Sequence, residues 1–264
     1  MPEGHTLHRL AREHQRIFGG TVISASSPQG RFVDGAALLD GRRLARAEAY
    51  GKHLLHHYAD GPILHVHLGL YGKFLGGAGS PPEPRGALRL RLSNAVAWTD
   101  LRGATACEIV TPADVVALVT RLGPDPLRRR ADPHLAYQRI ARSRTPIGVL
   151  LMDQQVIAGI GNVYRAEMLF RHRLSPFRPG RAVPHEVFAE LWADLVMLMR
   201  AGVRSGRIVT VRDEDRPRRG RLSPPESVYV YRRTGEPCRV CGSAVRTEVM
   251  AGRNLFWCPN CQAA

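Results

Sequence analysis

The chain has 264 residues, enough for two domains that each bury an apolar core. Its formal net charge of +15 favours a polyanionic partner, with nucleic acid foremost, although an arginine-rich composition alone would also make a protein basic. No apolar run is long enough to cross a membrane and no secretory signal pattern opens the chain. These features exclude membrane and secreted classes and predict a cytoplasmic protein.

The first half predicts one helix followed by a β-sandwich or barrel. Residues 6–18 space Leu7, Leu10 and Ile17 at helical intervals. Short apolar segments separated by glycine, proline and aspartate follow, and several alternate with the period of two that marks a half-buried strand. They are residues 53–58, 63–68, 88–92 and 95–98.

The second half predicts helices. A charged stretch with a proline at residues 128–133 places a domain boundary there. Residues 135–141, 147–154, 163–170 and 187–201 carry helical apolar spacing, whereas charges and prolines without periodicity predict a mobile loop over residues 211–227. We therefore expect domains over residues 1–127, 128–227 and 228–264.

The cysteines predict a metal site near the end of the chain. Four of the five lie there as two Cys-x-x-Cys pairs, Cys238 with Cys241 and Cys258 with Cys261, with sixteen residues between the pairs. Four thiolates without a histidine or an open position are typical of one structural zinc ion. Cys107 stands alone and is expected to be a small buried hydrophobic residue.

Two further features allow more than one interpretation. Gly159 and Gly161, at a junction between two predicted helices, would let backbone amides approach a phosphate, or they permit a tight turn between packed helices. The only two lysines are Lys52 and Lys73. Lysine can give up a proton more readily than arginine, so a lysine in such a chain can serve chemistry, although chance explains Lys73 as well.

Several motifs stand together in chain order: Pro2-Glu3-Gly4 at the start, Gly51-Lys52 before a strand, Gly159-x-Gly161-Asn162 between helices, and a four-cysteine finger that carries Arg253. In this respect the sequence resembles the Fpg/Nei family of bifunctional DNA glycosylases, and the opening residues with Leu70-Tyr71-Gly72 look most like its actinobacterial endonuclease VIII branch. The resemblance implies an α+β fold: an N-terminal β-sandwich, a helical domain with a helix-two-turn-helix motif, and a zinc-finger β-hairpin.

The resemblance also implies catalytic roles for Pro2, Glu3, Lys52 and Arg253. Removal of Met1 would leave the secondary amine of Pro2 as a nucleophile that attacks C1′ of the damaged nucleotide, and an α-amino group titrates near pH 8, so part of it is neutral. Glu3 would donate a proton that opens the sugar ring, and Lys52 would supply or relay a proton in the elimination. Arg253, at the finger tip, would contact the lesion phosphates; its alternative is a solvated turn arginine.

Other residues are expected to contact DNA. By resemblance, Asn162 and Arg121 would hold phosphates, although each also has an ordinary capping or surface role available. Leu70 and Tyr71 are the candidates for the wedge that fills the gap left by an extruded nucleotide, with packing in a strand as the alternative. Gly69 stands where the better-known endonuclease VIII pattern has glutamine, so it has no side chain to offer the orphaned base.

The function implied is removal of oxidised bases, pyrimidines favoured, with cleavage of abasic sites, in base excision repair. The expected partner is damaged DNA, duplex or, as for some relatives, single-stranded, bound by a monomer at the bacterial nucleoid with one structural Zn²⁺ and no membrane. Two competing interpretations remain: a non-enzymatic zinc-ribbon protein that binds nucleic acid, and a ribosome-associated protein that prefers folded RNA.

Overall fold

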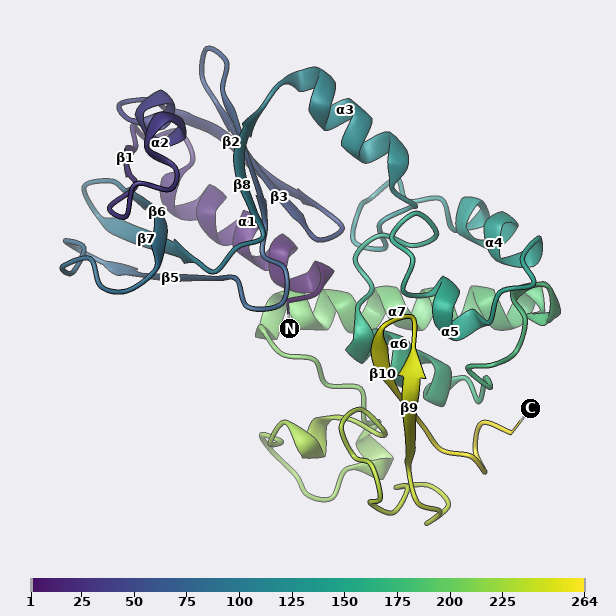
Figure 1. The fold of residues 1–264 in the computed structure, drawn as a ribbon. Coiled ribbons are helices and arrows are strands. Elements are labelled where there is room, and N and C mark those ends of the chain that lie inside the picture. Colours follow the sequence, from purple (N-terminus) through teal and green to yellow (C-terminus); the bar gives the residue numbers. More distant parts are fainter. Residues whose placement is uncertain (1, 264) are drawn as a thin grey trace. The chain divides into compact units, whose positions relative to one another are not determined.

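A computed structural model describes residues 2–263, which form two compact units that divide between Arg121 and Leu122 (Figure 1). The predicted α+β class is confirmed, with a β-sandwich in unit 1 and helices with a β-hairpin in unit 2. In the described part of the chain no helix is both long and apolar enough to span a membrane.

Unit 1 contains two four-stranded sheets in which all neighbouring strands are antiparallel. The first sheet has the order β1-β6-β7-β5, formed by β1 (Ser24–Ser26), β6 (Leu88–Ser93), β7 (Ala97–Arg102) and β5 (Lys73–Ala78). The second has the order β2-β3-β4-β8, formed by β2 (Leu44–Tyr50), β3 (His53–Tyr58), β4 (Ile63–His67) and β8 (Ala106–Val110). The strands predicted from alternation are therefore confirmed, with shifts at their ends.

Three helices accompany these sheets: α1 (Gly4–Phe18), α2 (Val33–Leu39) and α3 (Pro112–Arg121). The predicted helix α1 is confirmed and packs against β2 and β3 (Figure 1). Leu7, Ala11 and Phe18 lie on its buried face, and they join the apolar side chains of both sheets in one core. Burial of this stripe fixes the start of α1, and with it Pro2, relative to the sandwich.

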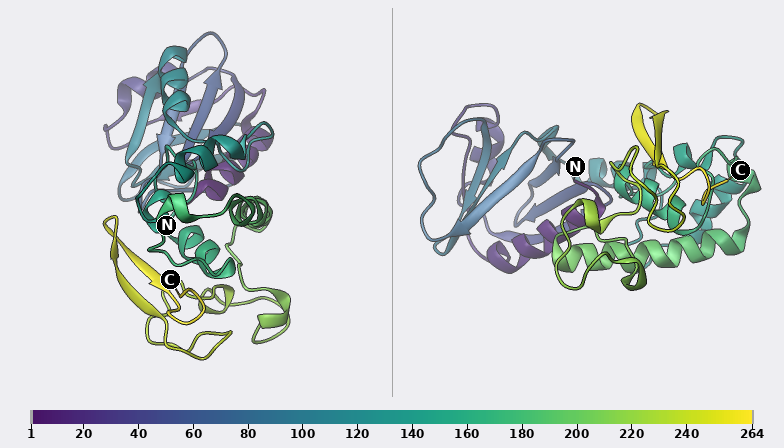
Figure 2. Two further views of the ribbon diagram at one scale, coloured as in Figure 1. Left: turned by 90° about the vertical axis from the view of Figure 1, so that its right-hand side faces the viewer. Right: turned by 90° about the horizontal axis from the view of Figure 1, so that it is seen from below.

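Unit 2 contains α4 (Pro133–Ala141), α5 (Ile147–Leu150), α6 (Asn162–Arg171) and α7 (His185–Ser205). Unit 2 also contains three single-turn 3₁₀ helices: η1 (Gly180–Ala182) between α6 and α7, and η2 (Asp213–Asp215) and η3 (Pro225–Ser227) after α7. The last two lie in the segment predicted to have no regular element. Figure 2 shows α7 as the long helix of this unit, and its apolar face packs into a core with α4, α5 and α6.

The end of the chain forms a hairpin of β9 (Arg246–Met250) and β10 (Arg253–Trp257), which packs on α6 (Figure 2). Phe256 shares a small core with Phe170 and Tyr229, and this core includes the first cysteine of each pair, Cys238 and Cys258. The four-cysteine module is thereby part of unit 2.

The units divide between Arg121 and Leu122 rather than after residue 127. Gly123 and Pro124 hydrogen-bond to residues of the loop that precedes α6, through Gly123 N to Gln154 O at 2.9 Å and Ala158 N to Pro124 O at 3.2 Å. Leu127 packs against the core of the helices. These contacts attach residues 122–127 to unit 2.

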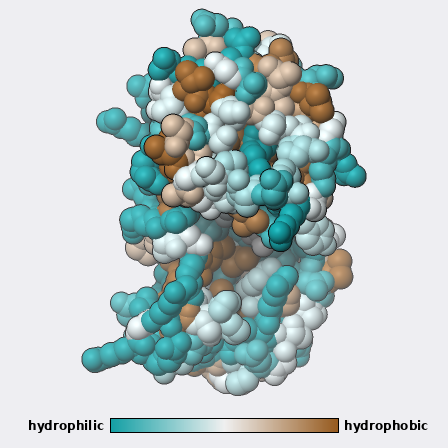
Figure 3. Space-filling model, turned by 90° about the vertical axis from the view of Figure 1, so that its left-hand side faces the viewer, coloured by the Kyte–Doolittle hydropathy of each residue, from teal (hydrophilic) through white to brown (hydrophobic). Residues whose placement is uncertain are grey.

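One face of the molecule carries mainly polar side chains. Figure 3 shows hydrophilic side chains spread over one face of the molecule, with hydrophobic ones in small groups between them. Among the large exposed hydrophobic side chains, Tyr71 has the greatest exposed fraction, 86%.

Candidate active site

The start of α1 places two of the predicted catalytic residues side by side. Glu3 occupies the N-cap position, where its carbonyl oxygen accepts a hydrogen bond from Thr6 N at 2.8 Å, and its side chain is fully buried. Pro2 is half-buried directly before it. Met1 lies outside the described residues. A carboxyl group is thus fixed at the positive end of a helix, next to a partly accessible imino acid.

His5 is the second residue of α1 and is also buried. Burial lowers the pKa of this imidazole to about 4, so the ring is neutral at physiological pH. The start of α1 therefore gathers a carboxyl group and a neutral imidazole, two groups capable of proton transfer.

Lys52 lies in a two-residue turn between β2 and β3. Gly51 takes the first central position with a φ of +55°, a conformation that glycine adopts without strain. The ammonium of half-buried Lys52 contributes to lowering the pKa of His53 and of His67, so its charge lies near both rings. The charge of Arg121, at the end of α3, also contributes to lowering the pKa of His53. Two predicted site residues of unit 1, Lys52 and Arg121, therefore gather around one imidazole.

Leu70 and Tyr71 lie in the turn between β4 and β5, with exposed fractions of 47% and 86%. The alternative, packing within a strand, is therefore wrong. Gly69 has a φ of +66°, and a Cβ atom there would lie 1.9 Å from Thr105 Oγ1. The turn thus requires glycine at this position, and it presents two unburied apolar side chains directly after it.

In unit 2, Asn162 begins α6 and bonds to the hairpin. Its Nδ2 donates to Asn254 O at 2.8 Å, and its Oδ1 accepts a hydrogen bond from Arg165. The buried Arg165 guanidinium also donates to Met250 O and Asn254 O, each at 3.2 Å. These bonds hold both strands of the hairpin against α6 and so bring Asn162 to the strand that carries Arg253.

The hairpin tip is a two-residue turn of Ala251 and Gly252, with φ values of +52° and +67°. A turn with positive φ at both central residues suits the twist of a two-stranded ribbon. Arg253 follows as the first residue of β10, half-buried and paired with Met250. The expected place of Arg253, at the finger tip, is confirmed.

The loop before α6 is closed by the side chain of Gln154. Its Oε1 accepts from Gly159 N at 2.9 Å, and its Nε2 donates to Ile160 O at 2.9 Å. Gly159 has a φ of +96°, which demands glycine, whereas Gly161 is extended. The tight-turn interpretation thus accounts for Gly159, while a phosphate contact of this loop stays a prediction.

The four cysteines meet as predicted. Their Sγ atoms all lie within 4.8 Å of one another, with 3.9 Å between Cys238 and Cys261 and 3.4 Å between Cys241 and Cys258. Tetrahedral thiolates around a zinc ion, with bonds of about 2.3 Å, would be roughly 3.8 Å apart. The donor set therefore fits one structural metal ion. Cys107 is buried in the core of unit 1, as expected.

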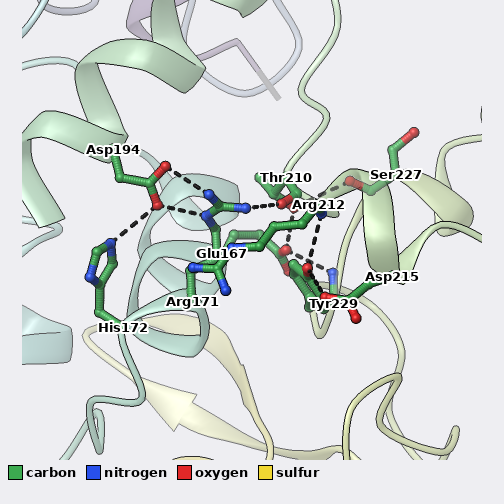
Figure 4. A network of polar contacts seen from close by, with 9 residues as sticks. All are labelled: Glu167, Arg171, His172, Asp194, Thr210, Arg212, Asp215, Ser227 and Tyr229. Carbon is green, nitrogen blue, oxygen red and sulfur yellow. Dashed lines mark hydrogen bonds and ion pairs between the residues drawn. The ribbon is translucent and has the colours of Figure 1, made fainter. Parts of the chain in front are cut away.

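A polar network around Glu167 and Arg171 of α6 was not predicted from the sequence. Figure 4 shows Arg171 paired with Asp194 on α7 and Glu167 facing the residues around Thr210 and Tyr229. Arg171 Nε lies 2.6 Å from Asp194 Oδ2. Every residue from Asn162 to Phe170 is buried, and a charged residue in a buried segment needs a polar partner. The charged residues Arg165 and Glu167 within this apolar helix were therefore the sequence signal that could have predicted such a network.

Comparison with known proteins covers nearly the whole chain. The formamidopyrimidine-DNA glycosylase N-terminal domain matches residues 1–107, the H2TH domain of the same glycosylase matches residues 122–213, and the zinc finger found in FPG and IleRS matches residues 235–264.

Relatives that match along nearly their whole length indicate the same family. Endonuclease 8 1 of Mycobacterium bovis is 58% identical, covering 99% of this chain and 100% of the relative. Formamidopyrimidine-DNA glycosylase of Thermus thermophilus is 32% identical, covering 99% and 97%. The structure of Lactococcus lactis Fpg in complex with DNA containing N7-benzyl-Fapy-dG has a TM-score of 0.83 at 22% identity, covering 100% of each chain, and this likeness concerns the fold. The chain therefore belongs to the Fpg/Nei family of DNA glycosylases.

Proposed function

We propose that the chain is a bifunctional glycosylase and AP lyase of base excision repair that uses the secondary amine of Pro2 as its nucleophile. The observation that carries this proposal is the pairing of half-buried Pro2 with fully buried Glu3 at a fixed helix start, in a member of this family. The proposed preference is for oxidised pyrimidines, with abasic sites cleaved as well.

The chemistry follows from these groups. The neutral amine attacks C1′ of the damaged nucleotide, the base leaves with a proton, and the opened sugar and Pro2 form an iminium ion. Glu3 donates the proton that opens the ring. The iminium draws electrons from C1′ and acidifies the hydrogens on C2′, so loss of a proton there expels the 3′ phosphate. Lys52 supplies or relays a proton in this elimination, and Arg253 contacts the lesion phosphates.

The remaining residues hold the substrate. Asn162 and Arg121 bind phosphates around the lesion, and Leu70 and Tyr71 enter the gap left by the extruded nucleotide. The exposure of these two apolar side chains in a turn supports this role. One Zn²⁺ on the four cysteines stabilises the finger without taking part in the reaction. The proposed working form is a monomer in the cytoplasm, at the nucleoid, on duplex or single-stranded damaged DNA.

Reductive trapping tests the proposal. Borohydride added to the protein with abasic-site DNA should yield a covalent complex, and peptide mapping should place the DNA on the N-terminal peptide. Replacement of Pro2 (Pro2→Gly) or one extra residue before it should lower the yield sharply, whereas Lys73→Gln, at the other lysine outside the site, should not. A protein that only binds DNA would shift its mobility without any covalent product.

The state of the N-terminus gives a second test. Intact mass measurement of active protein should show loss of Met1, since a retained methionine blocks the secondary amine. Full activity of protein that keeps Met1 would contradict the proposal.

A further inference from the structure

Four arginines of unit 2 lie on two segments that run side by side, residues 142–147 and 178–181. Arg181 N donates a hydrogen bond to Ser143 O at 2.8 Å. Further along, Ile147 N donates to Arg178 O at 2.8 Å. These bonds hold the arginines of one segment beside those of the other. We call the four side chains the arginine cluster: Arg142, Arg144, Arg178 and Arg181.

The fold fixes this pair of segments firmly. Pro146 pairs with Pro179 in an antiparallel bridge, and the ring of each proline fixes its own φ. A Cβ atom on Gly180 would lie 2.5 Å from Ile140 O of α4, so glycine allows the second segment to approach this helix closely. The backbone that carries the cluster is therefore ordered before a partner binds, which lowers the entropic cost of binding.

No carboxylate pairs with the arginine cluster within the described part of the chain. Three of its side chains are exposed and Arg178 is half-buried. Among residues 2–263, none of the four guanidinium groups has a hydrogen bond or an ion pair. Other arginines of unit 2 do pair with acids: Arg171 with Asp194, Arg216 with Asp213, Arg218 with Glu226, and Arg233 with Glu236. The cluster thus keeps an excess of positive charge that attracts anions.

The end of α4 explains only part of this arrangement. Basic residues near a helix C-terminus interact favourably with its partial negative charge, and Arg142 occupies the C-cap of α4. This effect falls off within the last turn, so it does not account for the arginines on the second segment. Like charges that lie side by side repel one another, and a bound polyanion relieves this repulsion.

The arginine cluster adjoins the hairpin that carries Arg253. Phe177 directly precedes Arg178 and packs edge-on against Trp257 of β10, with ring centroids 5.2 Å apart. Arg253 and Trp257 are the two ends of β10, so about 13 Å of strand separates them. The cluster therefore lies at the base of the hairpin, whereas Arg253 lies at its tip.

We propose that the arginine cluster is a second phosphate-binding site, which holds the backbone of duplex DNA outside the lesion. The inference rests on the proposed function for the identity of the polyanion. Arginine suits phosphate because its fork binds two oxygens at once and stays charged at physiological pH. Such contacts carry no base-sequence information, so the site adds affinity for DNA of any sequence and keeps the protein on the duplex.

The salt dependence of binding measures these contacts directly. The quadruple variant Arg142→Gln/Arg144→Gln/Arg178→Gln/Arg181→Gln should bind a duplex of about thirty base pairs more weakly, and the plot of log affinity against log salt concentration should flatten. Each phosphate contact contributes about 0.9 to that slope, so we expect a reduction of about 3 to 4. A slope within about 0.5 of the parent would overturn the inference.

Two further variants separate position and charge from damage to the fold. Exposed arginines elsewhere give a control with the same loss of charge: Arg12, Arg16, Arg31 and Arg200, each replaced by glutamine. Equal flattening of the slope by this control would overturn the inference. Substitution of the four cluster arginines by lysine keeps their charges and should keep the slope, because lysine also neutralises phosphate. A slope lowered as much by lysine as by glutamine would likewise overturn it.

The chemistry at the lesion should not depend on this site. At saturating protein, the glutamine variant should cleave an abasic site and form the borohydride-trapped complex at the parent rate. Slower cleavage at saturation would overturn the placement outside the lesion. A parent protein that neither cleaves nor traps would overturn the proposed function instead, and the salt slope on undamaged duplex would still test the cluster.

Competition between nucleic acids tests the choice of partner. Unlabelled duplex DNA should displace labelled duplex from the parent at a lower concentration than folded RNA does, and this preference should shrink in the glutamine variant. Displacement by folded RNA at the lower concentration, lost in the glutamine variant, would overturn the assignment of the cluster to DNA.

Discussion

The Glu167 carboxylate is fully buried on α6 and accepts hydrogen bonds from the chain that leads into the four-cysteine module. Its Oε1 accepts from Val230 N and Tyr231 N, each at 2.9 Å. Its Oε2 accepts from Tyr229 N at 2.7 Å and from the Thr210 hydroxyl. One side chain thus fastens both ends of the segment between residues 210 and 229 to the helix that starts with Asn162 (Figure 4).

Replacing this carboxylate with an amide (Glu167→Gln) keeps the shape and removes one acceptor oxygen. With the NH₂ group at the Oε2 position, the Thr210 hydroxyl can accept from it and donate to Ser227 O, 3.2 Å away, so the Tyr229 N–H is the donor that loses its acceptor. A buried donor left without an acceptor costs about 1–3 kcal/mol, which is the expected loss in the free energy of unfolding. The damage should be local, because the sandwich of unit 1 does not contain these bonds.

Hydrogen exchange checks the location, and thermal unfolding checks the size of the effect. In Glu167→Gln the amides of residues 229–231 should lose protection, while those of β3 and β4 keep theirs. An exposed glutamate on α7 gives the control, Glu190→Gln, which should change neither quantity. Unchanged protection of residues 229–231 together with a stability loss below about 0.5 kcal/mol would refute this account of Glu167.

Three further predictions concern other parts of the molecule. Burial lowers the pKa of His14 to about 4, and the ring lies 3.0 Å from the buried His56. Since only the unfolded state takes up a proton on this residue as the pH falls below 6.5, the contribution of His14 to stability should decline by about 3 kcal/mol between pH 6.5 and 4, in addition to the decline from His5, and urea unfolding of His14→Phe should show a shallower decline. Replacement of exposed Tyr71 (Tyr71→Ala) should leave the melting temperature unchanged but lower base removal from duplex DNA more than from single strands, as gel assays of both substrates would reveal; an equal loss on both would argue against a wedge. Metal analysis should find one zinc per chain, and a chelator or Cys258→Ser should release it and lower DNA affinity while unit 1 keeps its far-ultraviolet circular dichroism.

Periodicity alone identified most regular elements of this chain. The apolar stripe of α1, the alternation of β3 and β6, and the spacing in α4, α6 and α7 are local properties, and the structure contains elements in those places. Helix α3 was missed, since residues 115–119 are a nearly continuous apolar run without helical spacing and the helix has no fully buried residue. Helix α5 ends at Leu150, earlier than predicted, because Gln154 instead closes the following loop with its side chain.

The sequence by itself predicted the cysteine site, from the spacing within the two cysteine pairs. It also identified Pro2 and Glu3 as candidate catalytic residues, from their place in a family motif. Only the tertiary structure could decide which distant groups meet. Asn162 bonds to a carbonyl 92 residues away, Glu167 bonds to backbone amides more than 60 residues away, and His65 bonds to Glu108, 43 residues away on the adjacent strand. Such contacts arise from the packing of helices and the register of sheets, which bring together residues that are far apart in the chain, so no local spacing encodes them.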